Sequence, residues 1–329
     1  MTTRTTFPIT PPKQHLSWSS LCFVSSQESG EVAKIPSALD ADSLLAKELS
    51  QLSTEEREKV YDDIHGVSAP VEEEEEATAR LLSELEIELN CIHEKTAYEM
   101  ALALNRNYVC NRNFRVMFLR ADAYDAKAAA KRMVAFFEQK LEYFGADKLV
   151  TDITLQDLTE EDLDSLESGL IQKLKDKDRA GRTVLIVFPG LKKDRKLKNM
   201  VRVFACGLRH LLSLVRIPVL CFISIFNYIS VCGTKLRATF YVAMSCLEDD
   251  QAQRRGFVAS CYATQSTAPD HKFDPTYTRS FIQLRNVIPC RVESKHFCFD
   301  NAKLYWAFSL AICLSGSYSR VRLRAHYGR

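Results

Sequence analysis

Apolar residues recur every three or four positions between Ala126 and Phe144, and this spacing predicts one amphipathic helix. Asp125 stands just before it, where a carboxylate accepts hydrogen bonds from the free amides of the first turn. Gly145 follows the last apolar position, where a left-handed residue ends a helix at low cost. An apolar and basic segment, FRVMFLR (114–120), precedes this helix, with a break at Ala121-Asp122. The periodic positions are Ala126, Ala130, Met133, Phe137, Leu141 and Phe144.

Two further helices are predicted upstream. Ser53 and Glu56 form a capping box that starts a helix over 52–66, and Gly66 ends it. A second pattern runs from the five-acid stretch 72–76 to Leu104. Glutamates favour the first turn of a helix, so we interpret 72–76 as a solvated helix start, with an acidic interaction tail as the alternative. Together with 114–145 these helices form a predicted all-α lobe over 38–148.

Strand patterns begin after residue 149. Thr159 and Asp162 give another capping signal, for a short helix that closes near Gly169. A strand candidate over 170–174 and a polar turn over 175–182 follow. The β-branched run TVLIVF (183–188) is typical of a strand covered on both faces, and GFVASCYA (256–263) is a second such strand. The fold class expected is therefore α/β, with an all-α N-terminal lobe followed by a mixed sheet flanked by helices.

Two motifs resemble the CRAL-TRIO lipid-binding family. The FLRA segment (118–121), followed by a polar start and an alanine-rich helix, is similar to the entry helices of that family. DRAGRTVLIVF (178–188) resembles its D-x-x-G-R turn and first central strand. The resemblance implies a CRAL-TRIO-like lipid-binding domain over 149–329 and a non-catalytic function. The expected function is binding, and transfer, of a lipophilic ligand or phospholipid in an apolar cavity.

The resemblance also implies where a ligand lies. VIPCRVESKHFCFDN (287–301) is similar to the family segment that leads a strand into the pocket, which places His296, Phe297 and Cys298 near the ligand; a core strand with a satisfied histidine is the equal alternative. The aromatic helix 302–314 is either core or the gate over the pocket. The ligand-binding residues expected are Tyr262, His296, Phe297, Trp306 and Phe308.

Basic residues alternate with apolar ones near the end of the chain. This alternation, with a period of two residues, predicts a strand that carries all its basic groups on one face. Such a face could attract phosphate headgroups or could simply be solvated. The expected headgroup or membrane contacts are Arg320, Arg322, Arg324 and His326. Family members continue beyond this point with another acidic and aromatic segment, so we expect a shortened, incomplete domain.

The most apolar stretch of the chain lies between the two central strands. Its charge-free core, 217–232, has 16 residues, fewer than the roughly 20 that a membrane helix needs. The relatives it resembles have no such stretch, so we interpret 205–239 as an insertion. The alternative is an interaction, scaffold or membrane-anchored protein that attaches through 211–232.

Charge is distributed unevenly along the chain. The first 200 residues carry 27 Lys/Arg and 35 Asp/Glu, whereas the rest carry 17 and 7, so charges of −8 and +10 give the net +2. Contact with anionic lipid or pairing within the molecule explains this equally well. The near-neutral pI of about 7.9 argues against nucleic-acid binding.

Motifs for other classes of chemistry are missing from the sequence. It has no nucleotide-binding loop, nucleophile elbow or zinc-protease motif, so no catalytic residue, cofactor or metal ligand is assigned. The 11 cysteines lack paired spacing, which indicates free thiols in a reducing compartment. Residues 1–37 form a Ser/Thr/Pro-rich predicted disordered tail, with a targeting segment as the alternative. We expect a cytoplasmic monomer that contacts membranes transiently and peripherally.

Overall fold

The computed structural model describes residues 38–67, 73–188, 235–263, 275–300, 308–309, 312–313 and 315–327. The tail 1–37, the stretch 211–232 and most of the predicted insertion lie outside these residues. In the described part of the chain, eight α-helices precede the first strand: α1 (Ala38–Gln51), α2 (Thr54–His65), α3 (Glu75–Cys91), α4 (Thr96–Leu104), α5 (Arg106–Val109), α6 (Arg112–Ala121), α7 (Ala126–Phe144) and α8 (Glu160–Glu167). Two short 3₁₀ turns, Ala146–Lys148 and Leu155–Asp157, lie between α7 and α8.

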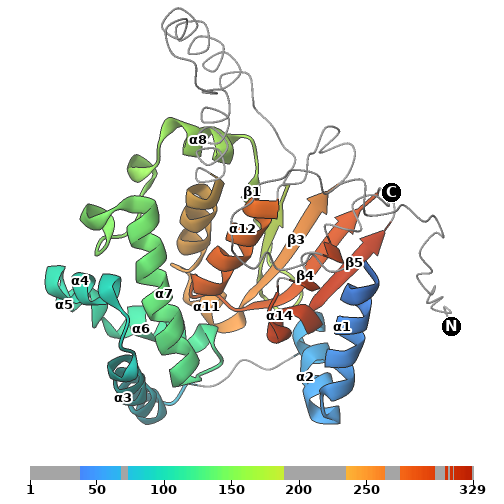
Figure 1. Ribbon diagram of the computed structural model, residues 1–329, viewed down its shortest axis with the longest axis horizontal. Coiled ribbons are helices and arrows are strands. Elements are labelled where there is room, and N and C mark those ends of the chain that lie inside the picture. Colours follow the sequence, from blue (N-terminus) through green and yellow to red (C-terminus); the bar gives the residue numbers. More distant parts are fainter. Residues whose placement is uncertain are drawn as a thin grey trace, which may run out of the picture. The chain divides into compact units, whose positions relative to one another are not determined.

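The remaining elements form and cover the sheet. They are β1 (Ile171–Lys173), β2 (Thr183–Val187), helical residues 235–246, α11 (Asp250–Arg255), β3 (Phe257–Ala263), α12 (Pro275–Val287), β4 (Val292–Phe299), α14 (Ser317–Val321) and β5 (Leu323–Tyr327). The chain is therefore α/β with a five-stranded mixed sheet flanked by helices, and this part of the predicted fold class is confirmed (Figure 1).

Local capping rules place the helix ends correctly. Ser53 accepts a hydrogen bond from the Glu56 amide while the Glu56 carboxylate accepts from the Ser53 amide, and Gly66 ends α2 in the left-handed region. Asp125 caps α7 by accepting from the Ala128 amide at 3.0 Å. Thr159 starts α8 through its own capping box. All these groups are adjacent in sequence, so their geometry follows from the local order of residues.

The long helix predicted between 73 and 104 is wrong, because the chain breaks into α3 and α4. Lys95 lies at the break, and its ammonium donates to the carbonyl of Leu89 at 2.7 Å, which satisfies one of the free carbonyls at the end of α3. Both helices then pack on α7 with buried apolar positions. The buried positions are Leu85, Leu89, Ala97, Tyr98 and Ala101.

The sheet follows the order of the sequence, β1-β2-β3-β4-β5. β1 and β2 are antiparallel, and each of the later pairs is parallel. Crossovers between parallel strands are right-handed in nearly all proteins. Because the strands advance in one direction across the sheet, right-handed crossovers all lie on the same face. We call this the crossover face and the other the opposite face.

Buried contacts agree with this rule. Leu185 and Phe257, on the crossover face, belong to one core cluster with Phe240 from 235–246 and with Leu284 and Ile288 around the end of α12. The same cluster contains Phe118 and Phe137 of α6 and α7, so the core crosses the domain boundary predicted at residue 148.

Helices α1 and α2 do not join the other N-terminal helices as predicted. α2 packs against β4, and α1 packs against α14. Val60 and Ile64 of α2 form a small apolar cluster with Val321 at the end of α14. The capping signals gave the length of α2 but contained no information about its partner, which lies more than 200 residues away in sequence.

The turn before β2 has the predicted polar chemistry. The Asp178 carboxylate accepts from the Arg182 amide at 2.7 Å and from the Arg182 guanidinium at 2.7 Å, while Gly181 adopts a φ of 74°. Arg182 also donates to carbonyls at the C-terminal end of α2, those of Asp63 and Ile64. The turn therefore fixes α2 at the start of the parallel strands.

Candidate functional site

The residues predicted to bind a ligand lie on both faces of the sheet. His296 and Phe297 are consecutive on β4, so their side chains point to opposite faces. Tyr262 of β3 pairs in register with Cys298 and shares the face of His296. Phe297 instead contacts Phe308, with ring centroids 6.0 Å apart. Trp306 lies outside the described residues. The predicted set is therefore divided between two places.

Phe297 and Phe308 belong to a separate apolar cluster. Phe308, Ile312 and Leu323 are buried at its centre, and we call it the Phe308 cluster; the residues packed against them are Leu45, Phe297, Cys313 and Ala325. Its floor is the crossover face of β4 and β5. The main core cluster does not include these residues.

Lys295 lies beside the Phe308 cluster on the crossover face. It pairs with Ala259 of β3 and with Leu323 of β5, and only 7% of it is exposed. Its burial, together with the positive charge of Arg285, lowers the pKa of the ammonium well below its usual value. Among the described residues, no carboxylate lies within ion-pair distance of it.

Arg285 of α12 is the second cation of this region. Its Nη2 atom is buried and has no hydrogen-bond partner. Burial lowers the pKa of the guanidinium to about 10, and the neighbouring charge of Arg132 acts in the same direction. The Cys290 thiol lies close enough to both cations for their charges to oppose the rise of its pKa, which burial nevertheless takes to about 11.

A hydrogen-bonded chain runs across the opposite face. Ser294 Oγ lies 2.9 Å from His296 Nε2, and His296 Nδ1 lies 2.8 Å from His326 Nε2. Burial and the neighbouring His326 lower the pKa of His296, which favours its neutral form. Ser294 is fully buried, so its hydroxyl cannot reach a substrate as a nucleophile. These hydrogen bonds link β4 to β5 and satisfy the polar groups of the side chains that form them. It also fits the alternative of a satisfied strand histidine.

Arg320 does not lie in a strand, as predicted, but in α14. Its guanidinium is buried and donates to the carbonyl of Ile312 at 2.8 Å, to the carbonyl of Ser315, and to Glu48 of α1. A side chain held in this way is not available to a phosphate headgroup.

Arg322 is also buried, with 4% of its surface exposed. It forms an ion pair with Asp63 of α2 at 2.5 Å and lies over the ring of Tyr318, 3.7 Å from its centroid. The prediction of a basic stripe on one strand face is wrong at these two positions because β5 begins only at Leu323. Carboxylates from α1 and α2 neutralise the arginines that precede it.

Arg324 and His326 do share a face of β5, as period two predicts. Arg324 is half-buried and donates to the carbonyls of Val321 and Leu323, while His326 is exposed and contacts His296. Of the four predicted headgroup contacts, only these two keep a part of their side chain accessible.

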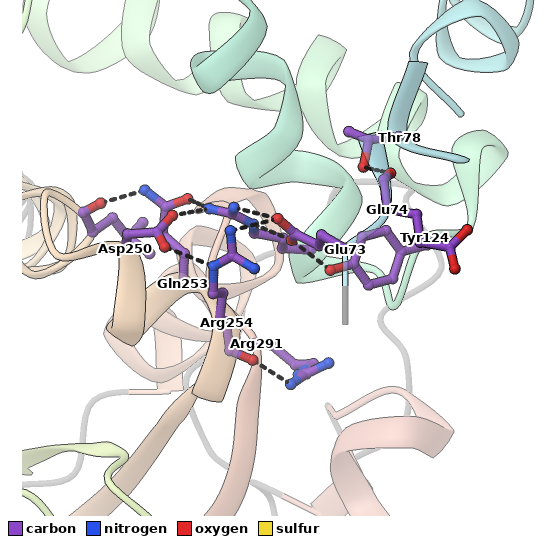
Figure 2. Close-up of polar contacts among 10 residues, drawn as sticks. Glu73, Glu74, Thr78, Tyr124, Asp250, Gln253, Arg254 and Arg291 are labelled. Atoms are coloured by element: carbon purple, nitrogen blue, oxygen red, sulfur yellow. Dashed lines mark hydrogen bonds and ion pairs between the residues drawn. The ribbon is translucent and has the colours of Figure 1, made fainter. Parts of the chain in front are cut away.

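A dense ion-pair cluster joins the start of α3 and the end of α6 to α11, the helix that precedes β3 (Figure 2). Glu73 lies at its centre, and its carboxylate accepts from Arg120 at 2.6 and 2.7 Å, from Arg254 at 2.7 Å and from the Tyr124 hydroxyl at 2.6 Å. Arg120 and Arg254 also bind Asp250 of α11. We call these five residues the Glu73 clamp.

The clamp corrects the interpretation of the acidic run. Glu75 and Glu76 are exposed in the first turn of α3, as predicted, but the side chain of Glu73 is only 10% exposed and precedes the helix. Tyr124 reaches Glu73 from the turn between α6 and α7, where its φ is 66°. That left-handed conformation is unfavourable for a tyrosine, so the surrounding contacts hold it in place.

Sequence reasoning missed Lys295 and Arg285 although both left a signal. Lys295 lies in the strand VESKHFCF, two residues before the apolar Phe297 and therefore on the same face. Arg285 interrupts an apolar helical pattern, FIQLRNVI. A lone charge in an apolar element is often snorkelling to solvent, so only the burial found in the structure separates these cations from ordinary surface residues.

Two negative findings apply to the described residues. Within those ranges, no helix is long and apolar enough to cross a membrane. The same part of the chain contains no group of three potential metal ligands, and its seven cysteines are free thiols. No protein-family model and no curated protein matches the chain, so the geometry of the two sheet faces is what bears on its function.

Proposed function

We propose that the chain binds a lipophilic ligand, without covalent chemistry, between the crossover face of β4–β5 and the helical residues around Phe308. The Phe308 cluster carries this proposal. It is apolar, it lies on β4 and the edge strand β5, and it is separate from the main core. A ligand can therefore replace its side-chain contacts without opening the core that holds the fold together. Ligand sites of this kind are mostly apolar, with few polar groups.

The two resembling motifs support the same proposal. FLRA lies in α6 and leads through a tight turn into the Asp125-capped helix α7, and the DRAGR turn leads into β2 of the sheet. A CRAL-TRIO-like carrier with a mixed sheet fits this order of elements. We propose further that it works as a cytoplasmic monomer that meets membrane surfaces transiently. Fully buried Ser294 supports binding over hydrolysis.

Native mass spectrometry of the purified full chain tests the proposal. We expect a population of protein with an added mass of lipid size, and organic extraction should release that lipid. Phe297→Glu places a charge on the crossover face and should remove the adduct. Tyr262→Glu is the matched control, because Tyr262 is exposed and lies on the opposite face; it should retain the adduct. A chain that stays empty after incubation with a total lipid extract contradicts the proposal.

A further inference from the structure

Among the described residues, two cations on the crossover side of the sheet, Lys295 and Arg285, have no anionic partner. Arg285 Nη2 is buried without a hydrogen bond, and Lys295 is 93% buried without an ion pair in the described part of the chain. The charge of Arg285 acts on Lys295 and helps to lower the pKa of its ammonium. Buried charges in proteins are ordinarily paired, because an unpaired one loses its hydration without compensation.

The other charged groups nearby are already engaged. Arg132 forms a double hydrogen bond with Asp122 at 2.6 and 2.7 Å and donates to the carbonyls of Asn286 and Ile288. Glu293, the acid closest in sequence, binds Arg291 and accepts from the Tyr318 hydroxyl at 3.1 Å. Arg132 and Glu293 are therefore paired with opposite charges, whereas Arg285 and Lys295 have no such partner in the described part of the chain.

The pair adjoins the Phe308 cluster. Lys295 is the direct cross-strand neighbour of Leu323, which is buried in that cluster, and Phe297 follows on the same strand face. Arg285 lies on α12 between Leu284 and Ile288, both buried in the main core. Lys295 thus stands at the edge of an apolar surface, and Arg285 is near enough for its charge to act on Lys295. This arrangement suits a molecule with a charged head and an aliphatic tail.

We propose that Arg285 and Lys295 bind the oxyanion head group, carboxylate or phosphate, of a lipophilic acid whose chain lies on the Phe308 cluster. This inference rests on the proposed function and adds the chemical class of the ligand. The guanidinium presents paired N–H donors in a geometry that matches an oxyanion. The Lys295 amine adds a second donor, and the arrival of a negative charge favours its protonated form.

Paired probes of equal chain length test the inference. Oleate and oleyl alcohol differ only in the head group, so a ratio of their dissociation constants isolates its contribution. Charge-assisted hydrogen bonds contribute enough that we expect oleate to bind roughly 10- to 100-fold more tightly. Oleyl phosphate distinguishes the two head groups, and inorganic phosphate alone tests whether the chain of the ligand is needed.

Neutral variants of similar length locate the effect. Lys295→Met and Arg285→Met should each lower the preference for oleate by roughly tenfold while leaving oleyl alcohol binding in place. Lys131→Met removes the same charge from an exposed position of α7 and should leave the preference unchanged.

Melting temperatures measured without ligand test whether Lys295 has only a structural role. Lys295→Met should melt at the same or a higher temperature, because it removes an uncompensated buried charge. Lys140 is also buried, but its ammonium donates to the carbonyl of Thr151 at 2.6 Å and to the Tyr108 hydroxyl at 3.2 Å. Lys140→Met should therefore melt at a lower temperature.

The outcomes separate the inference from the proposed function. Equal affinity for oleate and oleyl alcohol overturns the inference and leaves the proposed function standing, as does a preference that survives in both neutral variants. Inorganic phosphate could stabilise the wild type but not Lys295→Met while oleate, oleyl alcohol and oleyl phosphate all fail to bind. The site would then take a small anion, and the proposal that its ligand is lipophilic would be overturned. A chain that binds none of the probes, and is empty by mass spectrometry, contradicts both.

Discussion

Glu73 shows how far a residue can differ from its neighbours in a charged run. Its carboxylate is held by two arginines and a tyrosine, and the hydrogen bond from Arg120 is the largest of the effects that lower its pKa from 4.5 to about 2. A lowered carboxyl pKa stabilises the folded state above the unfolded value and loses that effect as the pH falls toward the folded value. Glu73 should therefore contribute about 3 kcal/mol at neutral pH, lost between pH 4.5 and pH 2.

The variant Glu73→Gln tests this contribution. It leaves Arg120 and Arg254 without their shared partner, so we expect a loss of about 3–5 kcal/mol in unfolding free energy at pH 7. The difference from the wild type should shrink as the pH falls from 4.5 to 2, measured by urea denaturation at each pH. Glu75→Gln is the matched control two residues away. Its side chain is 82% exposed, so it should change the free energy by less than about 1 kcal/mol at any pH.

At the residue scale, short-range chemistry was predictable and long-range chemistry was not. Ser53, Asp125 and Thr159 cap the helices that the sequence assigns to them, because each acts on amides two or three residues away. Arg320 and Arg322 pair with Glu48 and Asp63, more than 250 residues away in sequence. Their alternation with apolar residues resembled a strand face, and nothing local indicated the carboxylates that bury them.

Two helices end at glycines with positive φ but with different surroundings. Gly66 ends α2 at a φ of 67°, and a Cβ there would lie 2.5 Å from the Cβ of Ala180. Gly145 ends α7 at a φ of 76°, and a Cβ there would have no neighbour within 4 Å. Gly66 is left-handed, as predicted for a helix end, whereas Gly145 has a ψ of 177° and is not, so that prediction is wrong at Gly145. Only Gly66 adds a steric conflict with the turn before β2.

Alanine at each glycine separates these two effects. Gly145→Ala should cost about 1–3 kcal/mol, the penalty for a side chain at a φ of 76° and a ψ of 177°, a backbone region that essentially only glycine adopts. Gly66→Ala should cost about 2–5 kcal/mol, because overpacking adds about 1–3 kcal/mol. Chemical denaturation of both variants provides the comparison. A loss of only about 1–2 kcal/mol in Gly66→Ala would mean that α2 moves away from the turn without cost, contrary to the close contact with Ala180.

Elements with a single strong pattern were predicted well. The strands TVLIVF and GFVASCYA and the helix α7 lie where their apolar patterns place them. The break between α3 and α4 was missed, because apolar spacing continues through it and the decisive contacts are with α7. The unpaired cations of the candidate site were not predicted for a related reason. Charged residues are mostly exposed, so a charge in an apolar element indicates a site only when the structure shows how far it is buried.

The whole molecule explains the uneven charge of its two halves. Residues 1–200 carry a net charge of −8 and residues 201–329 one of +10. Several ion pairs join the two parts: Glu48 with Arg320, Asp63 with Arg322, and Glu73 with Arg254. Pairing within the molecule, one of the two explanations open at the outset, therefore accounts for part of the asymmetry. These contacts neutralise part of the positive charge of residues 201–329, so less of it is available to a membrane than the number of Lys and Arg residues indicates.

Residues 36–329 form one compact unit, and their core crosses from the helices to the sheet. Phe136 of α7 stacks on Phe240 at 5.5 Å, and Arg120 reaches Asp250 across the same boundary. We therefore expect helices and sheet to unfold together, with equal van't Hoff and calorimetric enthalpies in differential scanning calorimetry. Glu73→Gln should keep one transition at a lower temperature, and two resolved transitions in the wild type would contradict a shared core.

The sequential order of the strands has a consequence for how such a sheet tolerates change. Because each parallel strand pairs with the strand next to it in sequence, an inserted segment between two strands disturbs no hydrogen-bonded ladder elsewhere. Right-handed connections also keep every such segment on one side. The length of a crossover can thus differ without a change in strand pairing, and Ser294 and His296 lie on the opposite face, away from these segments.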